Sequence, residues 1–277
     1  MTGPDRIVPL FSSSSGNSTL IKSRGMYILV DCGMSCKMMT KALVESGVYP
    51  DDISAVFLTH RHTDHIGGVP VFSRKYHTPI YGTRATLAVL EGLSSPVTEI
   101  EENDIVKLEN GPEVRVFPTP HDVAGSVCYR IINSDTGSSF AVMTDLGRVN
   151  DGMRGFARAC DVILLESNYD PYMLENGPYP WPLKKRISGG HGHISNPESA
   201  ETAGYFISNG TRKFILGHLS PHNNTPVLAR ETFVNLLADR GFVEGIDYEV
   251  KIAKKDGFIS FLLIFNRSKM NIFFFFI

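Results

Sequence analysis

Cysteine is scarce in this sequence, and the few cysteines form no metal-binding motif. The 277 residues contain four, Cys32, Cys36, Cys128 and Cys160, and no two of them are spaced as C-x-x-C. A zinc ribbon is built from such pairs, and a small disulfide-stapled scaffold has a much higher density of cysteine. The sequence therefore excludes both, and we expect free, buried thiols in a reducing compartment.

An excess of basic charge is also absent. The chain has 27 Lys and Arg against 29 Asp and Glu, a formal net charge of −2. A protein that binds duplex nucleic acid over a wide face usually shows a clear basic excess, so any nucleic-acid contact must be local. The contents of 42% hydrophobic and 20% charged residues are those of an ordinary globular protein. They exclude intrinsic disorder and a collagen-like chain.

The sequence has no apolar run long enough to cross a membrane. Residues 1–10 show neither the basic segment nor the apolar stretch of a signal peptide. The apolar run 272–277 (IFFFFI) is far shorter than the stretch of about 20 residues that a spanning helix needs. We therefore expect a cytoplasmic protein without a membrane partner. No linker rich in Gly, Ser or Pro divides the chain, so we predict one domain over residues 1–265 and an apolar tail over 266–277.

Apolar periodicity predicts an α/β protein. Alternating or continuous apolar runs bounded by turn residues predict strands, and apolar residues three or four apart predict helices. The predicted strands are 6–11, 18–23, 26–31, 53–59, 79–81, 113–117, 126–132, 139–144, 162–166, 213–217, 248–253 and 257–265. The predicted helices are 37–46, 68–76, 83–91, 152–159, 197–208 and 227–240. Two successive halves, each with strands followed by helices, indicate two sheets between layers of helices.

The strongest chemical signal is a run of histidines directly after a predicted buried strand. His60, His62, Asp64 and His65 lie close together in the sequence, and imidazole and carboxylate are ligands that suit zinc, manganese or iron. A loop can turn His60 and His62 towards one point, and Asp64 with His65 towards a second point nearby. Four ligands cannot close two metal sites, so other segments should supply the rest.

Three further residues stand where a predicted strand runs into a loop. His121 follows strand 113–117, Asp145 ends strand 139–144, and His218 ends strand 213–217. Loops on a rigid scaffold are the usual position of site residues. Each residue alone could be a hydrogen-bonded structural group. Together with the histidine run they predict a metal centre, and both Zn²⁺ and Mn²⁺ are compatible with these ligands.

With these residues the chain resembles the metallo-β-lactamase superfamily. The H-x-H-x-D-H series of residues 60–65, followed by a His, an Asp and a final His, is similar to the metal-ligand series of that superfamily, and Asp31 matches its early structural aspartate. The resemblance covers residues from about 6 to 265. It implies an α/β fold, the αββα sandwich of two mixed β-sheets flanked by helices, with a dinuclear centre at the edge of the sheets. It also implies one metal ion on His60, His62 and His121, a second on Asp64, His65 and His218, and Asp145 as the bridge.

Further motifs resemble the YycJ/WalJ-type hydrolases of this superfamily. They are SSGNS at residues 14–18, ESN at 166–168, YP at 179–180, LKKRI at 183–187, GHISN at 192–196 and HLS at 218–220. The G-H-x-S and H-x-S motifs are also similar to the nuclease and phosphodiesterase branch, in which an extra histidine contacts the scissile phosphate. His193 is the matching position. The resemblance suggests a DNA exonuclease that acts in the 5′-to-3′ direction.

General chemistry agrees with a phosphodiesterase. Two metal ions about 3.5–4 Å apart suit in-line displacement at phosphorus by a bridging hydroxide, because they stabilise both the attacking and the leaving oxygen. His193 is not needed as a ligand, so it is available to protonate the leaving oxygen as a general acid, or to contact the phosphate. We assign catalytic roles to Asp64 and His193. The alternative for His193 is a purely structural role.

One basic triplet provides a candidate substrate contact. Lys184, Lys185 and Arg186 follow Trp181, the sole tryptophan. Cations beside an aromatic ring suit a single-stranded nucleic acid, which needs both stacking and neutralisation of its backbone. The predicted substrate-binding residues are Lys184, Lys185, Arg186, Ser195 and Asn196. A solvated helix face or a structural loop is the alternative for the triplet.

Two other functions share the metal centre. A thioester or lactam hydrolase of the glyoxalase II or β-lactamase type would use the same ligands, but it does not need His193. A metal-binding regulatory protein would also keep them, although an idle site has no reason to stay complete. The interval between Asp145 and His218 is too short for the extra domain of the β-CASP nucleases, and no long tRNA-gripping arm is evident. These features favour DNA or a small phosphodiester as the substrate.

Overall fold

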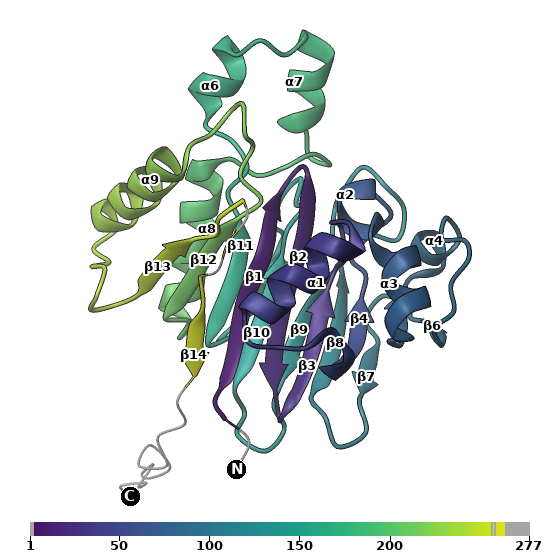
Figure 1. The fold of residues 1–277 in the computed structure, drawn as a ribbon. Helices are drawn as coiled ribbons and strands as arrows, with labels where there is room; N and C mark the ends of the chain where they lie inside the picture. The colour runs from purple at the N-terminus through teal and green to yellow at the C-terminus, as the bar shows by residue number, and fades with distance from the viewer. Residues whose placement is uncertain (1–2, 256, 258, 264–277) are drawn as a thin grey trace, which may run out of the picture.

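Two seven-stranded β-sheets, packed face to face, form the centre of the molecule (Figure 1). The computed structural model describes residues 3–255, 257 and 259–263. The first sheet contains, in spatial order, β14 (Phe261–Leu263), β1 (Asp5–Ser13), β2 (Gly16–Ser23), β3 (Met26–Val30), β4 (Ile53–Phe57), β5 (Ile80–Gly82) and β6 (Val97–Glu99). The second contains β13 (Glu249–Ile252), β12 (Lys213–Gly217), β11 (Val162–Glu166), β10 (Ser139–Met143), β9 (Val127–Ile132), β8 (Glu113–Pro118) and β7 (Ile105–Lys107).

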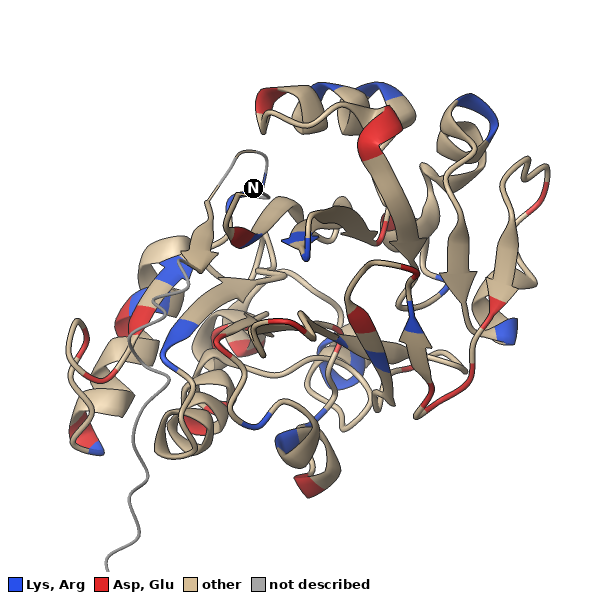
Figure 2. Ribbon diagram, turned by 90° about the horizontal axis from the view of Figure 1, so that it is seen from below, with Lys and Arg blue, Asp and Glu red and all other residues tan. Residues whose placement is uncertain are grey.

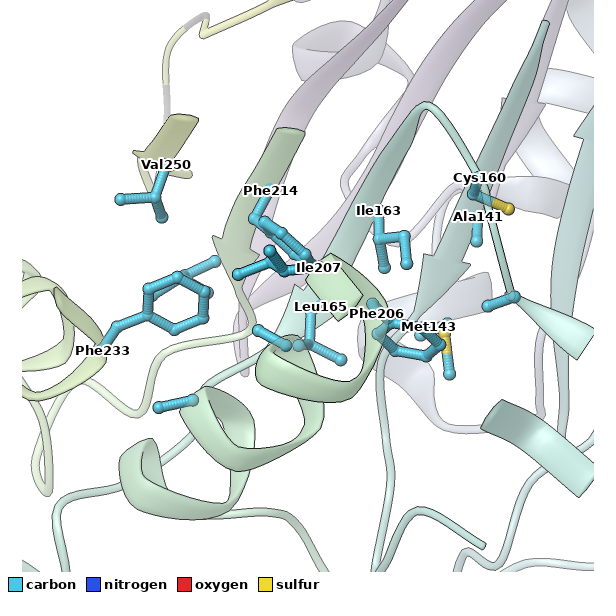
Figure 3. Close-up of a cluster of buried hydrophobic side chains, with 14 of the residues drawn as sticks. Ala141, Met143, Cys160, Ile163, Leu165, Phe206, Ile207, Phe214, Phe233 and Val250 are labelled. Atoms are coloured by element: carbon cyan, nitrogen blue, oxygen red, sulfur yellow. The ribbon is translucent and has the colours of Figure 1, made fainter. Parts of the chain in front are cut away.

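Helices cover the outer face of each sheet, which confirms the predicted αββα sandwich. The helices of the described residues are α1 (Cys36–Glu45), α2 (Thr63–Ile66), α3 (Val69–Tyr76), α4 (Arg84–Leu87), α5 (Asp151–Phe156), α6 (Pro171–Asn176), α7 (Trp181–Ile187), α8 (Asn196–Ser208) and α9 (Pro226–Asp239), with a 3₁₀ turn η1 (Pro50–Asp52). α1 and α3 pack on the first sheet, and α8 and α9 on the second (Figure 3). Within the described residues, no helix has the length and apolar character to cross a membrane.

The central strands are buried on both faces, which explains their continuous apolar sequences. In β11, Val162 and Leu164 point into the core between the sheets, while Ile163 and Leu165 pack under α8 on the other side (Figure 3). Phe206 of α8 belongs to the same outer cluster. Burying a side chain of this size contributes roughly 1.5–3 kcal/mol. The core between the sheets and the two outer clusters, one under α1 and α3 and one under α8 and α9, therefore form a rigid support for the loops at the strand ends.

The direction of the strands brings the predicted site residues to one edge of the sandwich. Strands β3 to β6 are parallel to one another, and so are β10 to β13. Strand β8 pairs antiparallel with β9, which pairs antiparallel with β10, so β8 also runs with β10. Ligands in open α/β sheets bind in the crevice outside the carboxyl ends of the strands. The loops that carry the predicted metal ligands all follow such ends.

Some predicted elements differ from the structure. The helix predicted over 83–91 is only the single turn α4, and the strands β6 and β7 and the helices α6 and α7 were not predicted. All three residues of β6 are exposed and no residue of α7 is buried, so neither element has an apolar period to detect. The four cysteines are free and buried, as predicted. The tail 266–277, and residues 264 and 265 of the last predicted strand, lie outside the described residues.

Acidic and basic residues are interspersed in the view of Figure 2. Basic ribbon segments there alternate with acidic ones, and no wide face of one sign is visible. This distribution agrees with the near balance of 27 basic and 29 acidic residues in the sequence. Any contact with a polyanion on this face must therefore be local.

Candidate metal centre

The histidine loop follows β4 and is held by a close backbone approach. His62 is the residue before α2, and its extended backbone lets the chain turn from the strand end into this short helix. The loop before α1 lies directly against α2. A Cβ added at Gly33 would lie 1.7 Å from the carbonyl oxygen of Asp64, so only glycine permits this approach. The turn places His60 before it, and Asp64 and His65 after it, at the same edge of the sheet.

Three imidazoles converge at the first part of the site. Nε2 of His60 lies 3.0 Å from Nδ1 of His62, which lies 3.4 Å from Nε2 of His121. One nitrogen of each ring lies within 4.8 Å of the others. His60 and His121 are buried, and His62 is partly exposed. Three such ligands could hold one ion and leave a position open for water or substrate.

Asp64, His65 and His218 form a second group beside the first. Oδ2 of Asp64 lies 3.5 Å from Nε2 of His65 and 3.9 Å from Nε2 of His218. Asp145 lies between the groups, because its Oδ2 is 3.3 Å from Nε2 of His65 and its Oδ1 is 3.7 Å from Nε2 of His121. The structure thus brings the seven residues predicted as ligands together at one edge of the sandwich.

Two atoms of this cluster fit a cation particularly well. Oδ2 of Asp145 and Nε2 of His218 are buried and have no hydrogen-bond partner. A buried polar atom without a partner costs roughly 1–3 kcal/mol, and more when it is charged. Asp145 and His218 also adopt left-handed backbone angles, with φ of 59° and 56°. Such strain in residues other than glycine is uncommon and concentrates at functional sites.

The pKa shifts at His60 and Asp145 favour the protonation states that bind a cation. Burial lowers the pKa of His60 well below its usual value, so its imidazole is neutral and offers a lone pair. Burial acts against ionisation of Asp145, but the surrounding histidines, His218 and His65 foremost, hold its pKa well below the usual range. The same attraction outweighs burial at His65 and raises its pKa to about 9. Binding of an ion must therefore displace protons from the metal-free site.

Three polar residues outside the cluster fix the orientation of the second group. Oδ2 of Asp31 lies 2.7 Å from Nδ1 of His65, so the other ring nitrogen faces the cluster. Thr59 donates to the same carboxylate from its backbone and its hydroxyl. Nδ2 of Asn17 donates to Oδ2 of Asp64 at 3.1 Å, which gives the SSGNS motif a structural role. Hydrogen bonds of this kind set the tautomer and direction of ligating side chains.

Glu166 is a site residue whose role the sequence did not reveal. Its carboxylate is fully buried, and Oε1 lies 2.9 Å from Nδ1 of His193 and 2.8 Å from Nδ1 of His218. Oε2 accepts hydrogen bonds from the backbone N–H groups of Leu146 and Ile194. The sequence offered one indication of such a role. Glu166 ends the strand β11 and is followed by two further polar residues, which are also buried. With Nδ1 engaged, each histidine has Nε2 left for an ion or a substrate.

His193 lies beside two of the residues predicted as ligands, His121 and His218. Its ring centre is 5.4 Å from that of His121 and 5.2 Å from that of His218. The side chain is 20% exposed, whereas His218 is almost completely buried. It is therefore the histidine of this group that a substrate can reach from solvent.

The basic triplet lies on α7, next to the centre, but its members have different contacts. Arg186 binds Asp122 through Nε at 2.6 Å and also through Nη2. Lys184 donates to the backbone carbonyl of Glu175 in α6. The Lys185 amine lies over the ring of Trp181. Arg186 thus belongs to an ion pair of the site rather than to an open patch.

Ser195 and Asn196 use their side chains inside the protein. Ser195 caps α8 in a reciprocal arrangement with Glu198. Asn196 is completely buried, and its amide exchanges hydrogen bonds with Ser167 and Asn224. These contacts favour support of the loop that carries His193 over the predicted contact with substrate.

The convergence of these ligands agrees with comparisons to known proteins. Residues 26–219 match the family described as beta-lactamase superfamily domain. The chain belongs to this superfamily. It is 37% identical over 247 residues to exodeoxyribonuclease WalJ of Streptococcus pneumoniae, which covers 87% of this chain and 91% of that protein. It is 33% identical over 245 residues to exodeoxyribonuclease YycJ of Bacillus anthracis, which covers 87% of this chain and 92% of that protein.

Solved structures of the superfamily share the fold. The metallo-beta-lactamase fold protein YhfI from Bacillus subtilis has a TM-score of 0.69 at 18% identity and covers 93% of this chain and 99% of that one. Human tRNase Z, short form, has a TM-score of 0.62 at 16% identity and covers 92% and 98%. Family membership and the close relatives make this member of the superfamily a metal-dependent hydrolase of the nuclease type.

Proposed function

We propose that this protein is an exodeoxyribonuclease that hydrolyses phosphodiester bonds with two divalent ions, Zn²⁺ or Mn²⁺. Two relatives that are 37% and 33% identical over nearly the whole chain are named exodeoxyribonucleases. The observation that carries the proposal is the hydrogen bonding of Glu166 to both His193 and His218. It fixes a further histidine beside the predicted ligands, which suits hydrolysis of a phosphodiester and which metal storage does not need.

The ligands divide into two groups of three around one shared carboxylate. His60, His62 and His121 would hold one ion, and Asp64, His65 and His218 the other, with Asp145 between the two groups. A pair of divalent ions supplies an activated water and neutralises charge on the phosphate. The carboxylate of Asp64 faces the water-accessible side, since its side chain is 23% exposed, so it can orient the attacking water.

His193 acts on the leaving oxygen. Glu166 accepts a hydrogen bond from Nδ1 of His193, so Nε2 is the nitrogen that meets the substrate, as a general acid or as a contact to the phosphate. A positioned general acid contributes about 10²–10⁴-fold to a rate. A thioester or lactam hydrolase, or a regulatory metal protein, would have the same ligands but would give the Glu166–His193 pair no role.

One assay separates these functions. The protein, with Mn²⁺ or Zn²⁺, is incubated with single- and double-stranded DNA and RNA labelled at either end, with nitrocefin and with a thioester. We expect stepwise shortening of DNA from the 5′ end, the direction suggested by the family resemblance. Shortening from the 3′ end would overturn the direction only. Hydrolysis of the lactam or the thioester, with DNA left intact, would contradict the proposed nuclease activity.

A further inference from the structure

Helices α6 and α7 project beyond the sheet ends next to the metal centre, at the top of Figure 1. They carry two of the most exposed aromatic side chains among the described residues, Tyr172 at 74% and Trp181 at 69%. No residue of α7 is buried. Packing of the protein itself therefore does not explain the aromatic ring at the start of α7.

Cations accompany the ring of Trp181. Nζ of Lys185 lies 5.1 Å from the ring centre. The backbone carbonyl of Glu175 accepts a hydrogen bond from Lys184, which ties α7 to α6 and holds a second cation on the same short helix. An exposed indole with a lysine over its ring offers a face for stacking and a charge for a phosphate backbone.

The start of α7 is connected to the catalytic groups over a short distance. α7 ends at Ile187, whose carbonyl accepts the backbone N–H of His193 at 2.8 Å. The carbonyl of Gly192 lies 3.2 Å from Nδ1 of His121. Six helical steps of 1.5 Å separate Trp181 from Ile187, about 9 Å, which corresponds to roughly two or three stacked nucleotides of one strand.

We propose that Trp181 and Lys185 form a platform, here called the α7 platform, that binds a single-stranded segment of the nucleic-acid substrate a few nucleotides from the scissile bond. The inference rests on the proposed function and specifies how its substrate is held. A base can stack on the indole only when its face is open, and paired bases in a duplex do not offer one. A duplex would instead need a wider basic surface than the balanced charge of this chain supplies.

The sole tryptophan of the sequence reports on this site directly. The metal-loaded protein is titrated with a single-stranded DNA oligonucleotide whose phosphorothioate linkages slow hydrolysis, and indole fluorescence is recorded. We expect saturable quenching that weakens with salt. In a parallel titration of labelled oligonucleotide, Trp181→Ala should weaken binding by about tenfold, the effect of losing one stacked base. Lys185→Ala should lower the slope of log affinity against log salt by about 0.7, the value for one phosphate contact of a single strand.

Matched controls occupy other parts of the surface. Tyr49→Ala removes an aromatic side chain that is 70% exposed beyond the end of α1, and Lys107→Ala removes an exposed lysine of β7, at the far end of the molecule in Figure 1. Both should bind the oligonucleotide like the wild type. Equal affinity in all four variants, with nuclease activity intact, would overturn the platform but leave the proposed function standing.

Two other outcomes would also overturn the α7 platform. Quenching by duplex DNA as strong as by single strands would remove the single-stranded specificity. A change of emission with protein concentration alone, together with a dimer that Trp181→Ala abolishes, would mean that a second copy of the chain covers the ring. Loss of all hydrolysis of nucleic acid by the wild-type protein would instead contradict the proposed function.

Discussion

Arg186 and Asp122 form an ion pair that joins helix α7 to the metal centre. Nε of Arg186 donates to Oδ2 of Asp122 at 2.6 Å, and Oδ1 of Asp122 lies 3.3 Å from Nε2 of His62. Partial burial acts to raise the pKa of Asp122, but Arg186 lowers it below its usual value. The ionised carboxylate therefore holds the His62 ring so that Nδ1 faces the other ligands.

Removal of this ion pair should weaken one of the two metal sites. We expect Arg186→Ala and Asp122→Asn to lower the affinity for the ion held by His62 by about 10–100-fold, the usual effect of losing a hydrogen-bonded support of a ligand. Competition with a chromogenic chelator measures this affinity without any substrate. Arg186→Lys should restore part of it. Lys185→Ala, which removes a neighbouring cation that lies over Trp181, is the control, and a loss of the same size there would contradict the assignment.

Glu166 should be essential for the shared orientation of two histidines. In Glu166→Gln the amide group can accept only through one oxygen, so it cannot satisfy the Nδ1–H groups of both His193 and His218 together with two backbone donors. We expect kcat on DNA to fall by at least about 10²-fold, with a smaller change in KM, and a flattened pH profile. Glu166→Asp should recover part of the rate.

A matched glutamate separates catalysis from general folding effects. Glu198 caps α8, and Glu198→Gln should keep kcat close to that of the wild type. Circular dichroism on both variants checks that the fold is kept. Unchanged kcat in folded Glu166→Gln would mean that the Glu166–His193 pair is structural.

Most residues of the candidate metal centre could be predicted from the sequence, because they follow strands with strong apolar patterns. His60, Asp145 and His218 lie within three residues of the ends of strands that are largely buried, so their position at a sheet edge could be predicted. The resemblance to the metallo-β-lactamase superfamily then implied how these residues divide into ligand groups. The same patterns predicted the two sheets and the helices that cover them.

The features that could not be predicted from the sequence depend on tertiary contacts. Glu166 is the last residue of its strand, and only the fold reveals that it reaches histidines 27 and 52 positions away. The ion pair of Arg186 with Asp122 spans 64 positions, so Arg186 resembled its neighbours in the basic triplet. Short exposed elements such as β6 and α7 have no apolar period, and their existence depends on packing against other segments.

The stability of the metal-free protein should depend on pH because of His65. The folded pKa of His65 is raised to about 9, above the unfolded value of about 6.5. Its contribution to stability is therefore fully present below pH 6.5 and is lost as the pH rises through about 9. His218, whose pKa is also raised, acts in the same direction.

We therefore expect the thermal midpoint of chelator-treated protein to fall by roughly 5 °C or more from pH 6.5 to 9. Metal binding displaces these protons, so metal affinity should rise over the same interval. Differential scanning calorimetry with and without the ion measures both effects. A metal-free midpoint that stays constant or rises across this range would contradict the prediction.

Asp145 should be the origin of that pH dependence as well as the shared ligand. Burial lowers the pKa of both His65 and His218. The negative charge of Asp145 is the largest of the influences that raise the two pKa values. In Asp145→Asn the side chain keeps its size but loses the charge, so we expect the pKa of His65 to fall and the pH dependence of the metal-free midpoint to flatten. The variant should also bind less metal and lose hydrolysis. NMR titration of the imidazole, beside metal analysis, tests this. Asp135→Asn, which changes an exposed aspartate paired with Arg24, is the charge-matched control and should keep both the pH dependence and the metal.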